Sequence, residues 1–248
     1  MRRHGAWIGL LLAAVIAVAP AEALRFTPFV VSLAPSGAGA NQVFQVENET
    51  EVSAAIQISL VHREMGVDGK ETLKEAEDDF IVFPPQMVLL PHEARAIRLQ
   101  WAGDPKPAAE LPYRIIVEQL PVRLDTGDAK GTQLSLVVRY EGAVYITPEG
   151  AKPDIVVERA EPATGPDGKP RLAVELWNKG TAHAILQNAS LTVSAAAGGQ
   201  SLTLKGDQLG GLLDQNVLGG HRRRFLVPWP QGLAVGPVRA SLDFVPGL

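Results

Sequence analysis

Hydrophobic and polar residues alternate along most of the chain, with a period of two. Clear examples are residues 42–47 (QVFQVE), 54–60 (AAIQISL) and 171–176 (RLAVEL). Alternation of this kind is typical of strands that bury one face and expose the other. Clusters of turn-forming residues separate the runs, as at residues 36–39 and 165–168. Short strands between such turns predict an all-β fold, either a sandwich or a barrel.

One motif occurs twice in the chain, at an offset of 128 residues. Residues 90–101 (LPHEARAIRLQW) and residues 218–229 (LGGHRRRFLVPW) share a Leu, an Arg, two apolar positions and a Trp at the same spacing. A second motif precedes each copy and ends in Asn48 in the first half and in Asn178 in the second. A chain of 248 residues with 46% hydrophobic content can supply two cores. We therefore expect two domains of similar construction.

Two segments interrupt the alternating pattern. Residues 68–79 are polar and rich in charge, which fits a single helical turn or a solvated hairpin loop equally well. Residues 147–153 (TPEGAKP) contain prolines and a glycine, which end a strand and stiffen a short connector. We expect the hinge there, with a first domain over residues 24–148 and a second over residues 149–248.

The first 23 residues have the pattern of an export signal. A short basic start at Arg2 and Arg3 precedes an almost unbroken apolar run over residues 6–19, and residues 21–23 (AEA) form a cleavage site. The apolar run is shorter than the roughly 20 residues that a membrane span requires, which favours cleavage over an uncleaved anchor. We expect a signal peptide over residues 1–23 and an exported mature protein that begins near Leu24.

Composition argues against several classes of function. The net charge is only −4, which disfavours a nucleic-acid partner held by phosphate contacts. The chain has no cysteine, so it lacks a catalytic thiol and a thiolate ligand for zinc. Its five histidines are not spaced as metal ligands, and no phosphate-binding loop, dinucleotide fingerprint or nucleophile elbow is present. The sequence therefore predicts a protein that is not an enzyme and has no cofactor, metal site or small-molecule substrate.

The segment of residues 131–140 is the candidate binding element. Its apolar residues Leu134, Leu136 and Val138 share one face of a strand. An ordinary core strand is one interpretation. The segment is also the last strand expected before the linker, which in an immunoglobulin-like sandwich lies at a sheet edge. An edge strand offers unpaired backbone groups to which a partner can add its own strand.

Several short segments follow one another in an order that is known from a protein family: residues 44–48 (FQVEN), 80–85 (FIVFPP), 90–91, 97–99, 110–121 and 144–148. In this order and spacing the chain resembles the periplasmic pilus chaperones of the PapD type, over essentially all of the mature sequence. The resemblance implies two immunoglobulin-like β-sandwich domains joined by a short linker and set in an L. It also implies a periplasmic location.

Chaperones of this family bind a pilus or fimbrial subunit that lacks its final strand and lend it an edge strand, before the subunit passes to an outer-membrane usher. The resemblance implies that Leu134, Leu136 and Val138 are the lent apolar side chains. An exposed apolar edge needs protection in the free protein, and self-association is one way to provide it.

The family binds the terminal carboxylate of the subunit with two basic residues, and this chain departs from that pattern. The expected positions fall at or near Ser32 and Ala143. A carboxylate in the cleft still needs a cation, and the candidates are Arg139, Arg114 and Arg98. Each could instead belong to a structural ion pair. Loss of the usual pair makes the chain similar to the archaic branch of the family, found with spore-coat-U-like subunits.

Two other classes of function stay open at this point. A structural or adhesive surface protein could be assembled from tandem immunoglobulin-like domains, although such a subunit would normally carry an N-terminal extension of alternating apolar residues. An enzyme could be built on the same scaffold, because a fold alone does not exclude catalysis. The sequence shows no cluster of titratable residues that would support the second alternative.

Overall fold

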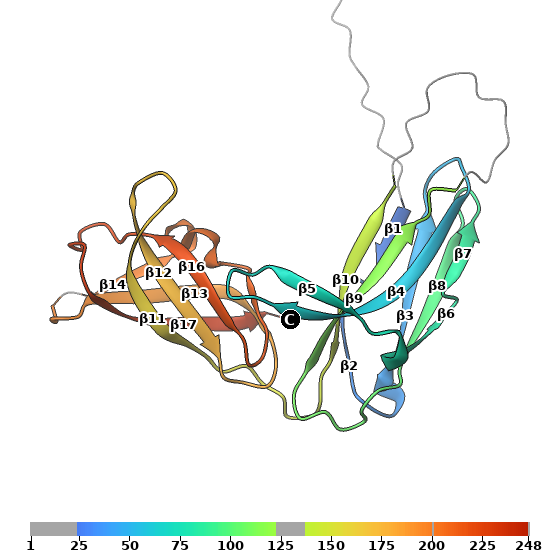
Figure 1. The fold of residues 1–248 in the computed structure, drawn as a ribbon, viewed down its shortest axis with the longest axis horizontal. Coiled ribbons are helices and arrows are strands. Elements are labelled where there is room, and N and C mark those ends of the chain that lie inside the picture. The colour runs from blue at the N-terminus through green and yellow to red at the C-terminus, as the bar shows by residue number, and fades with distance from the viewer. Residues whose placement is uncertain (1–23, 123–136, 200, 248) are drawn as a thin grey trace, which may run out of the picture.

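The computed structural model describes residues 24–122, 137–199 and 201–247 (Figure 1). The expected signal peptide over residues 1–23 and two of the expected donor residues, Leu134 and Leu136, lie outside the described residues. No helix in the described ranges is long and apolar enough to cross a membrane.

The first half of the chain forms a sandwich of two sheets. The sheet that we call the outer sheet has the strand order β1-β3-β8-β6, with β1 (Leu24–Thr27), β3 (Asn41–Asn48), β8 (Ala94–Trp101) and β6 (Phe80–Phe83). The sheet that we call the junction sheet has the order β2-β10-β9-β4-β5, with β2 (Val30–Leu33), β10 (Arg139–Ile146), β9 (Leu111–Gln119), β4 (Ala54–Met65), β5 (Glu71–Glu75) and, beside β4, β7 (Gln86–Leu89). Strands β2 and β10 run parallel, and the other neighbours are antiparallel. Two short 3-10 helices complete this half, η1 (Ala38–Ala40) and η2 (Glu77–Asp79).

The second half forms another sandwich. One sheet has the order β11-β12-β16, with β11 (Ile155–Thr164), β12 (Pro170–Asn178) and β16 (Arg222–Pro228). The other has β13 between its neighbours, with β14 (Ser201–Lys205), β13 (Ala184–Ala195), β15 (Asn216–Val217) and β17 (Val238–Gly247). A 3-10 segment, η3 (Gly206–Leu212), follows β14.

The alternation in the sequence corresponds to burial in the structure. In β3 the side chains of Phe44 and Val46 are fully buried, whereas Gln45 between them is exposed. Buried apolar residues form one large core in each sandwich, and the two cores are separate clusters. The prediction of an all-β fold with two sandwich domains is therefore confirmed.

The two copies of the repeated motif occupy the same place in the two sandwiches. Phe44 lies opposite Ile97 in the pair β3–β8, and Val174 lies opposite Phe225 in the pair β12–β16, in the same register relative to the motif. Asn48 and Asn178 are both fully buried at the ends of their strands. The repeat in the sequence therefore reflects a repeat in the structure.

The charge-rich segment of residues 68–79 contains both of the expected structures. Strands β4 and β5 form a hairpin that turns at residues 66–70, and η2 supplies a single 3-10 turn before β6. The hairpin extends beyond the first sandwich, and Figure 1 shows β5 reaching toward the second sandwich. Residues 147–154 connect the two sandwiches, which lie at an angle to each other (Figure 1).

Candidate functional site

The junction sheet buries one face in its own core and turns the other toward the second sandwich. Tyr113 and Ile115 of β9 belong to the first core, so that Arg114 between them lies on the opposite face. On that face Met65 and Tyr145 pack together with Leu218 of the second sandwich, away from either large core. We call this face, with the facing residues of the second sandwich, the junction.

Tyr145 of β10 links the two sandwiches through its hydroxyl group. The Arg63 Nη2 atom donates a hydrogen bond of 3.0 Å to the Tyr145 hydroxyl oxygen, and Asn216 Nδ2 of the second sandwich donates one of 2.7 Å to the same atom. Arg63 is only 2% exposed, and its guanidinium lies 5.4 Å from the centre of the Tyr145 ring. The ring of His183 stacks on Tyr145 at a centroid distance of 3.7 Å. The tyrosine is therefore held from both domains.

Glu110 forms a second link between the sandwiches. Its Oε1 atom accepts hydrogen bonds from the backbone N–H of His183 (2.9 Å) and from Nδ1 of the same residue (2.6 Å), and its Oε2 atom accepts one from Thr147 (2.8 Å). Burial by itself raises the pKa of Glu110, but the hydrogen bonds and charge of His183, together with Thr147, outweigh burial and hold this pKa below its ordinary value. The carboxylate side chain is 4% exposed, so it stays ionised inside the junction.

The tip of the β4–β5 hairpin forms a third link. The backbone N–H of Arg224 in β16 donates to the carbonyl oxygen of Val67 at 2.8 Å. Arg223 Nη1 donates to Sδ of Met65 (3.1 Å) and to the carbonyl oxygen of Asn216 (2.7 Å). The hairpin tip thus covers part of the β16 edge, which would otherwise be open to strand addition.

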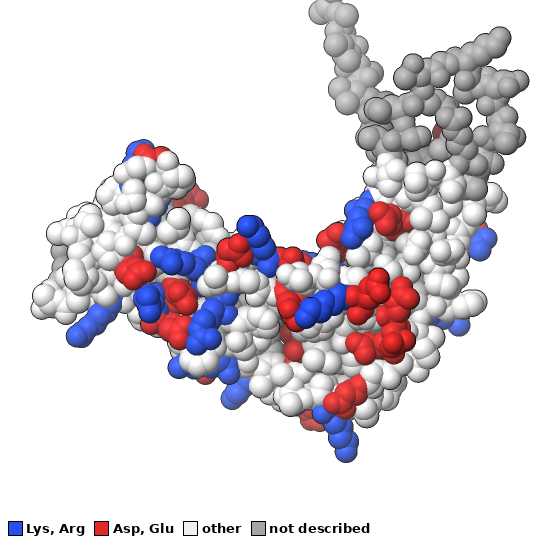
Figure 2. Space-filling model, in the orientation of Figure 1, with Lys and Arg blue, Asp and Glu red and all other residues white. Residues whose placement is uncertain are grey.

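An arginine pair and one carboxylate lie on the junction sheet beside these links. Arg114 of β9 donates to Glu71 of β5 through two nitrogens, Nε to Oε2 at 3.0 Å and Nη2 to Oε1 at 2.6 Å. The Nη1 atom of Arg63 lies 3.5 Å from the same Oε1 atom. Figure 2 shows charged side chains of both signs gathered around the hollow between the two lobes. This cluster has the donors that a carboxylate ligand requires.

The three arginines that the sequence offered as carboxylate anchors have different surroundings. Arg114 lies on the junction face, directly opposite Ala143 in the β9–β10 pair. Arg139 lies at the start of β10, is 43% exposed, and pairs with Glu141 and Glu118 at 2.9 and 3.7 Å. Arg98 lies in the outer sheet and is exposed on the face away from the core. The structure brings only Arg114 together with the polar groups of the junction.

Val138 is the one expected donor residue within the described ranges. Its side chain is partly buried against the first core, and its carbonyl oxygen accepts a hydrogen bond of 2.9 Å from the backbone N–H of Gln119. The neighbouring Val137 is 50% exposed. The chain at this point therefore runs beside β9, with Val138 facing the core side of the sheet.

Arg63 is a residue of the junction that sequence reasoning missed. In β4 the residues Ile56, Ile58 and Leu60 face the first core, so the alternation places Arg63 on the other face. A charged residue on the non-core face normally indicates contact with water. Its burial results from the second sandwich, for which the local sequence contains no signal.

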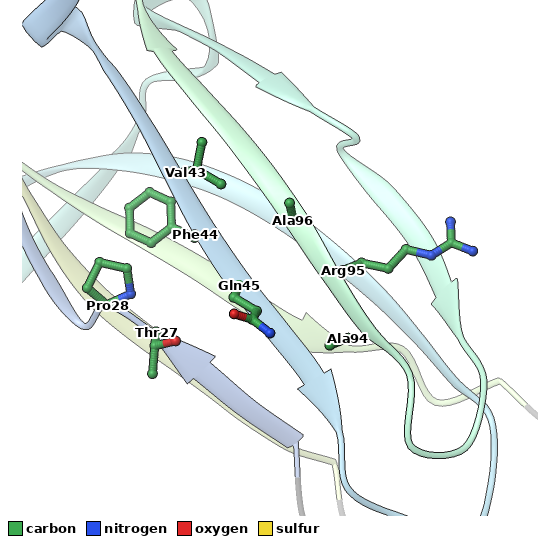
Figure 3. A pocket seen from close by; sticks show the side chains of 8 residues that line it. All are labelled: Thr27, Pro28, Val43, Phe44, Gln45, Ala94, Arg95 and Ala96. Carbon is green, nitrogen blue, oxygen red and sulfur yellow. The ribbon is translucent and has the colours of Figure 1, made fainter.

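A pocket of about 380 Å³ lies on the outer sheet, away from the junction (Figure 3). Pro28, Val43 and Ala96 line it, and the charged end of Arg95 points away from it toward Glu93. Over the described residues no group of three His, Cys, Asp or Glu side chains could hold a metal ion. The pocket thus lacks clustered titratable groups of the kind that catalysis needs.

One protein-family model and several solved structures match this chain. Residues 31–152 match the family described as pili and flagellar-assembly chaperone, PapD N-terminal domain. No curated protein matches the chain in sequence. Among solved structures, one similar chain belongs to the CsuC–CsuE chaperone–tip adhesion subunit pre-assembly complex of the archaic chaperone-usher Csu pili of Acinetobacter baumannii, with 17% identity, a TM-score of 0.57 and coverage of 85% of this chain and 89% of that one.

Two further structures have the same fold. The class 5 fimbriae chaperone CfaA is 14% identical with a TM-score of 0.54, and the alignment covers 90% of this chain and 99% of that one. A chain from the Salmonella enterica complex of the SafA pilin with the SafB chaperone is 17% identical with a TM-score of 0.52, and the alignment covers 84% and 85% of the two chains. At these identities the likeness establishes the two-domain fold.

Proposed function

This chain belongs to the PapD-type family of pilus-assembly chaperones, and we propose that it binds pilus or fimbrial subunits by lending them an edge strand and delivers them to an outer-membrane usher. The observation that carries this proposal is the open edge of β10. Strand β2 pairs with β10 only at residues 143–146, and among the described residues no strand pairs with that edge at residues 139–142. An unpaired strand edge is the element to which a partner strand adds.

The apolar side chains that precede β10 are the proposed donors. Val138 faces the core side of the junction sheet. Leu134 and Leu136 occupy the alternate positions of the sequence, and we propose that the three side chains share one face when the segment is lent to a subunit as a strand. A subunit strand paired with this edge would bring its own core next to these residues. Full burial would contribute about 1.5–3 kcal/mol for each side chain that starts exposed. Val138 would contribute less, because it is already partly buried.

We place the carboxylate anchor at Arg114. The position near Ala143 lacks the basic residue that the family uses, and Arg114 lies directly opposite it on the same face of the sheet. Its guanidinium already makes a two-nitrogen contact with a carboxylate, that of Glu71. Arg139 is a weaker candidate because it is more exposed, and Arg98 lies in the other sheet.

The remaining parts of the proposal concern processing and organisation. We propose a signal peptide over residues 1–23, a periplasmic mature protein, a first domain over residues 24–148 and a second over residues 149–248. The two separate cores support the division, because their members lie within residues 24–146 and 155–244. We propose a binding protein without catalytic function or cofactor.

Co-purification from the periplasm tests the function. The wild type and a Leu134→Glu, Leu136→Glu double variant are compared for capture of exported pilin-like proteins, with Val137→Glu as the control because Val137 is exposed and lies next to Val138 on the other face. We expect a one-to-one complex with the wild type and the control, and none with the double variant. If all forms are folded and capture nothing, the proposed function is wrong. If the double variant does not fold, the leucines belong to the core and the donor strand is misassigned.

A further inference from the structure

We propose that Glu71 occupies the place at Arg114 that the terminal carboxylate of a subunit takes on binding, and we call it a stand-in for that carboxylate. It holds Arg114 in binding geometry while the chaperone is free, and it is displaced when a subunit binds. This inference rests on the proposed function and concerns the regulation of the same site.

The contact between Arg114 and Glu71 has the geometry of ligand binding. Two nitrogens of one guanidinium donate to the two oxygens of one carboxylate, at 3.0 and 2.6 Å. This parallel arrangement is the one by which arginine recognises free carboxylates. A peptide terminus that approached Arg114 would need the same two N–H groups. Glu71 and the ligand therefore compete for one site.

Positive charge exceeds negative charge in the cluster. Glu71 is the carboxylate shared by Arg114 and Arg63, and the Nε atom of Arg63 is buried and has no hydrogen-bond partner among the described residues. Arg223 and Asp68 also lie nearby, which leaves three arginines against two carboxylates, and burial holds the pKa of Arg223 below its ordinary value. A buried cation without full compensation is costly, so a second carboxylate that entered the cluster would be stabilised.

Arg63 is fixed, whereas the side chain of Glu71 is partly exposed at the end of a strand. Arg63 is 2% exposed and is held by Tyr145, which in turn is held by Asn216 of the second sandwich. Glu71 is the first residue of β5, next to the hairpin turn, and its side chain is 24% exposed. A rotation of its side chain can transfer the carboxylate to water without disturbing a strand. Arg63 and Tyr145 therefore keep their positions when Glu71 leaves, and the incoming carboxylate replaces Glu71 at Arg114.

Removal of the glutamate charge should strengthen binding of a carboxylate. We expect Glu71→Gln to bind a free peptide terminus about tenfold more tightly than the wild type, which corresponds to ~1.4 kcal/mol. Glu75→Gln is the matched control, because Glu75 lies on the same face of the same strand and forms no ion pair in the described residues. Glu71→Asp keeps the charge with a shorter side chain and should tighten binding less.

Peptide binding to the full mature protein tests the inference. The probe is a fluorescent peptide of alternating valine and threonine, prepared with a free terminal carboxylate and as the terminal amide, and its anisotropy reports the dissociation constant. Tighter binding of the free acid by Glu71→Gln, with the amide and the Glu75→Gln control unchanged, would support the stand-in.

The other outcomes separate the two proposals. If the wild type prefers the free acid and Glu71→Gln binds it equally or less tightly, Glu71 is part of the binding site and the stand-in is wrong, although the chaperone function stands. If Glu71→Gln does not fold, unchanged or weaker binding by Glu71→Asp would overturn the inference in the same way. If no variant distinguishes acid from amide, the Arg114 anchor is wrong and the stand-in with it. If no variant binds either peptide, strand lending itself is contradicted.

Discussion

Asn48 and Asn178 show how single side chains shape both sandwiches. Asn48 Nδ2 donates to the carbonyl oxygens of Val52 (2.8 Å) and Leu90 (3.0 Å), and Asn178 Nδ2 donates to those of Ala182 (2.8 Å) and Val217 (3.0 Å). Each amide thus satisfies backbone carbonyls in two neighbouring segments at once. Both asparagines also match the short pattern of the sequence repeat. Their recurrence reflects a buried polar group that bonds similarly placed backbone carbonyls in each domain.

Replacing either asparagine should destabilise the protein. We expect Asn48→Ala and Asn178→Ala to lower the free energy of unfolding by about 2–3 kcal/mol each, because buried carbonyl oxygens lose their donor. Urea unfolding followed by fluorescence measures the change. Asn41→Ala is the control, since Asn41 is exposed at the other end of β3 and makes a single bond of 3.4 Å. Losses as small as that of the control would contradict this role.

At the scale of elements, two similar hairpin turns have different surroundings. The β4–β5 turn contains Gly66 and Gly69, and the β11–β12 turn contains Gly165 and Gly168, with the same backbone hydrogen bond between the glycines at 2.9 and 3.0 Å. Gly69 and Gly168 both have a positive φ, of 84° and 74°. A side chain at Gly168 would meet no atom, whereas one at Gly69 would overlap the guanidinium of Arg223. Only the first turn is docked.

Gly69 and Gly168 provide a matched test of whether the β4–β5 hairpin docks on the second sandwich. Gly69→Ala and Gly168→Ala should both cost about 1–2 kcal/mol of stability from the left-handed backbone. Only Gly69→Ala should also displace Arg223 and loosen the hairpin from β16. We expect faster hydrogen exchange of the Arg224 amide, which donates to Val67, in Gly69→Ala alone. Equal exchange in the two variants would show that the hairpin docks without this close contact.

At the scale of the whole molecule, polar groups at the junction join the two domains. Glu110 precedes β9 in the first sandwich and accepts two hydrogen bonds from His183 of the second. The backbone N–H of Glu110 also donates to the carbonyl oxygen of Thr181 at 2.8 Å. A buried carboxylate with this many donors is stabilised as the anion. The contact between the domains therefore depends on the ionised form of Glu110.

Acid should weaken this contact. Because the pKa of Glu110 is lower in the folded protein than its ordinary value of 4.5, its contribution to stability is complete above pH 4.5 and is lost as the pH falls through the lowered folded value. Urea unfolding from pH 7 to pH 3 measures the effect in the wild type and in Glu110→Gln. We expect the variant to be less stable at neutral pH and the difference to shrink in acid.

Other groups titrate in the same range and make the comparison with the variant necessary. Burial lowers the pKa of His62 below 6.5, so this residue favours the folded state less as the pH falls below that value. His62 is present in both proteins, and its effect cancels in the difference. A difference that stays constant from pH 7 to pH 3 would contradict a role for the ionised Glu110.

Local sequence determined the elements of this protein and tertiary structure determined its site. Alternation in β3 and β12 predicted which side chains face a core, and the repeated Asn and Trp motifs predicted two similar domains, because burial of one strand face is a local and periodic property. The residues that meet at the junction could not be read in this way. Arg63 and Tyr145 are 82 positions apart, and Arg114 and Glu71 are 43 apart.

The reason is that the sequence of a strand does not determine what covers the face that points away from its own core. Arg98, Arg114 and Arg139 look alike in the sequence, each on a strand with its charge away from the first core. Strand order places Arg98 in the outer sheet and the other two in the junction sheet, and the docking of the second sandwich buries Arg63 beside Arg114. Alternation fixes the face that is buried in a strand's own domain, whereas sheet order and domain docking decide what covers the other face.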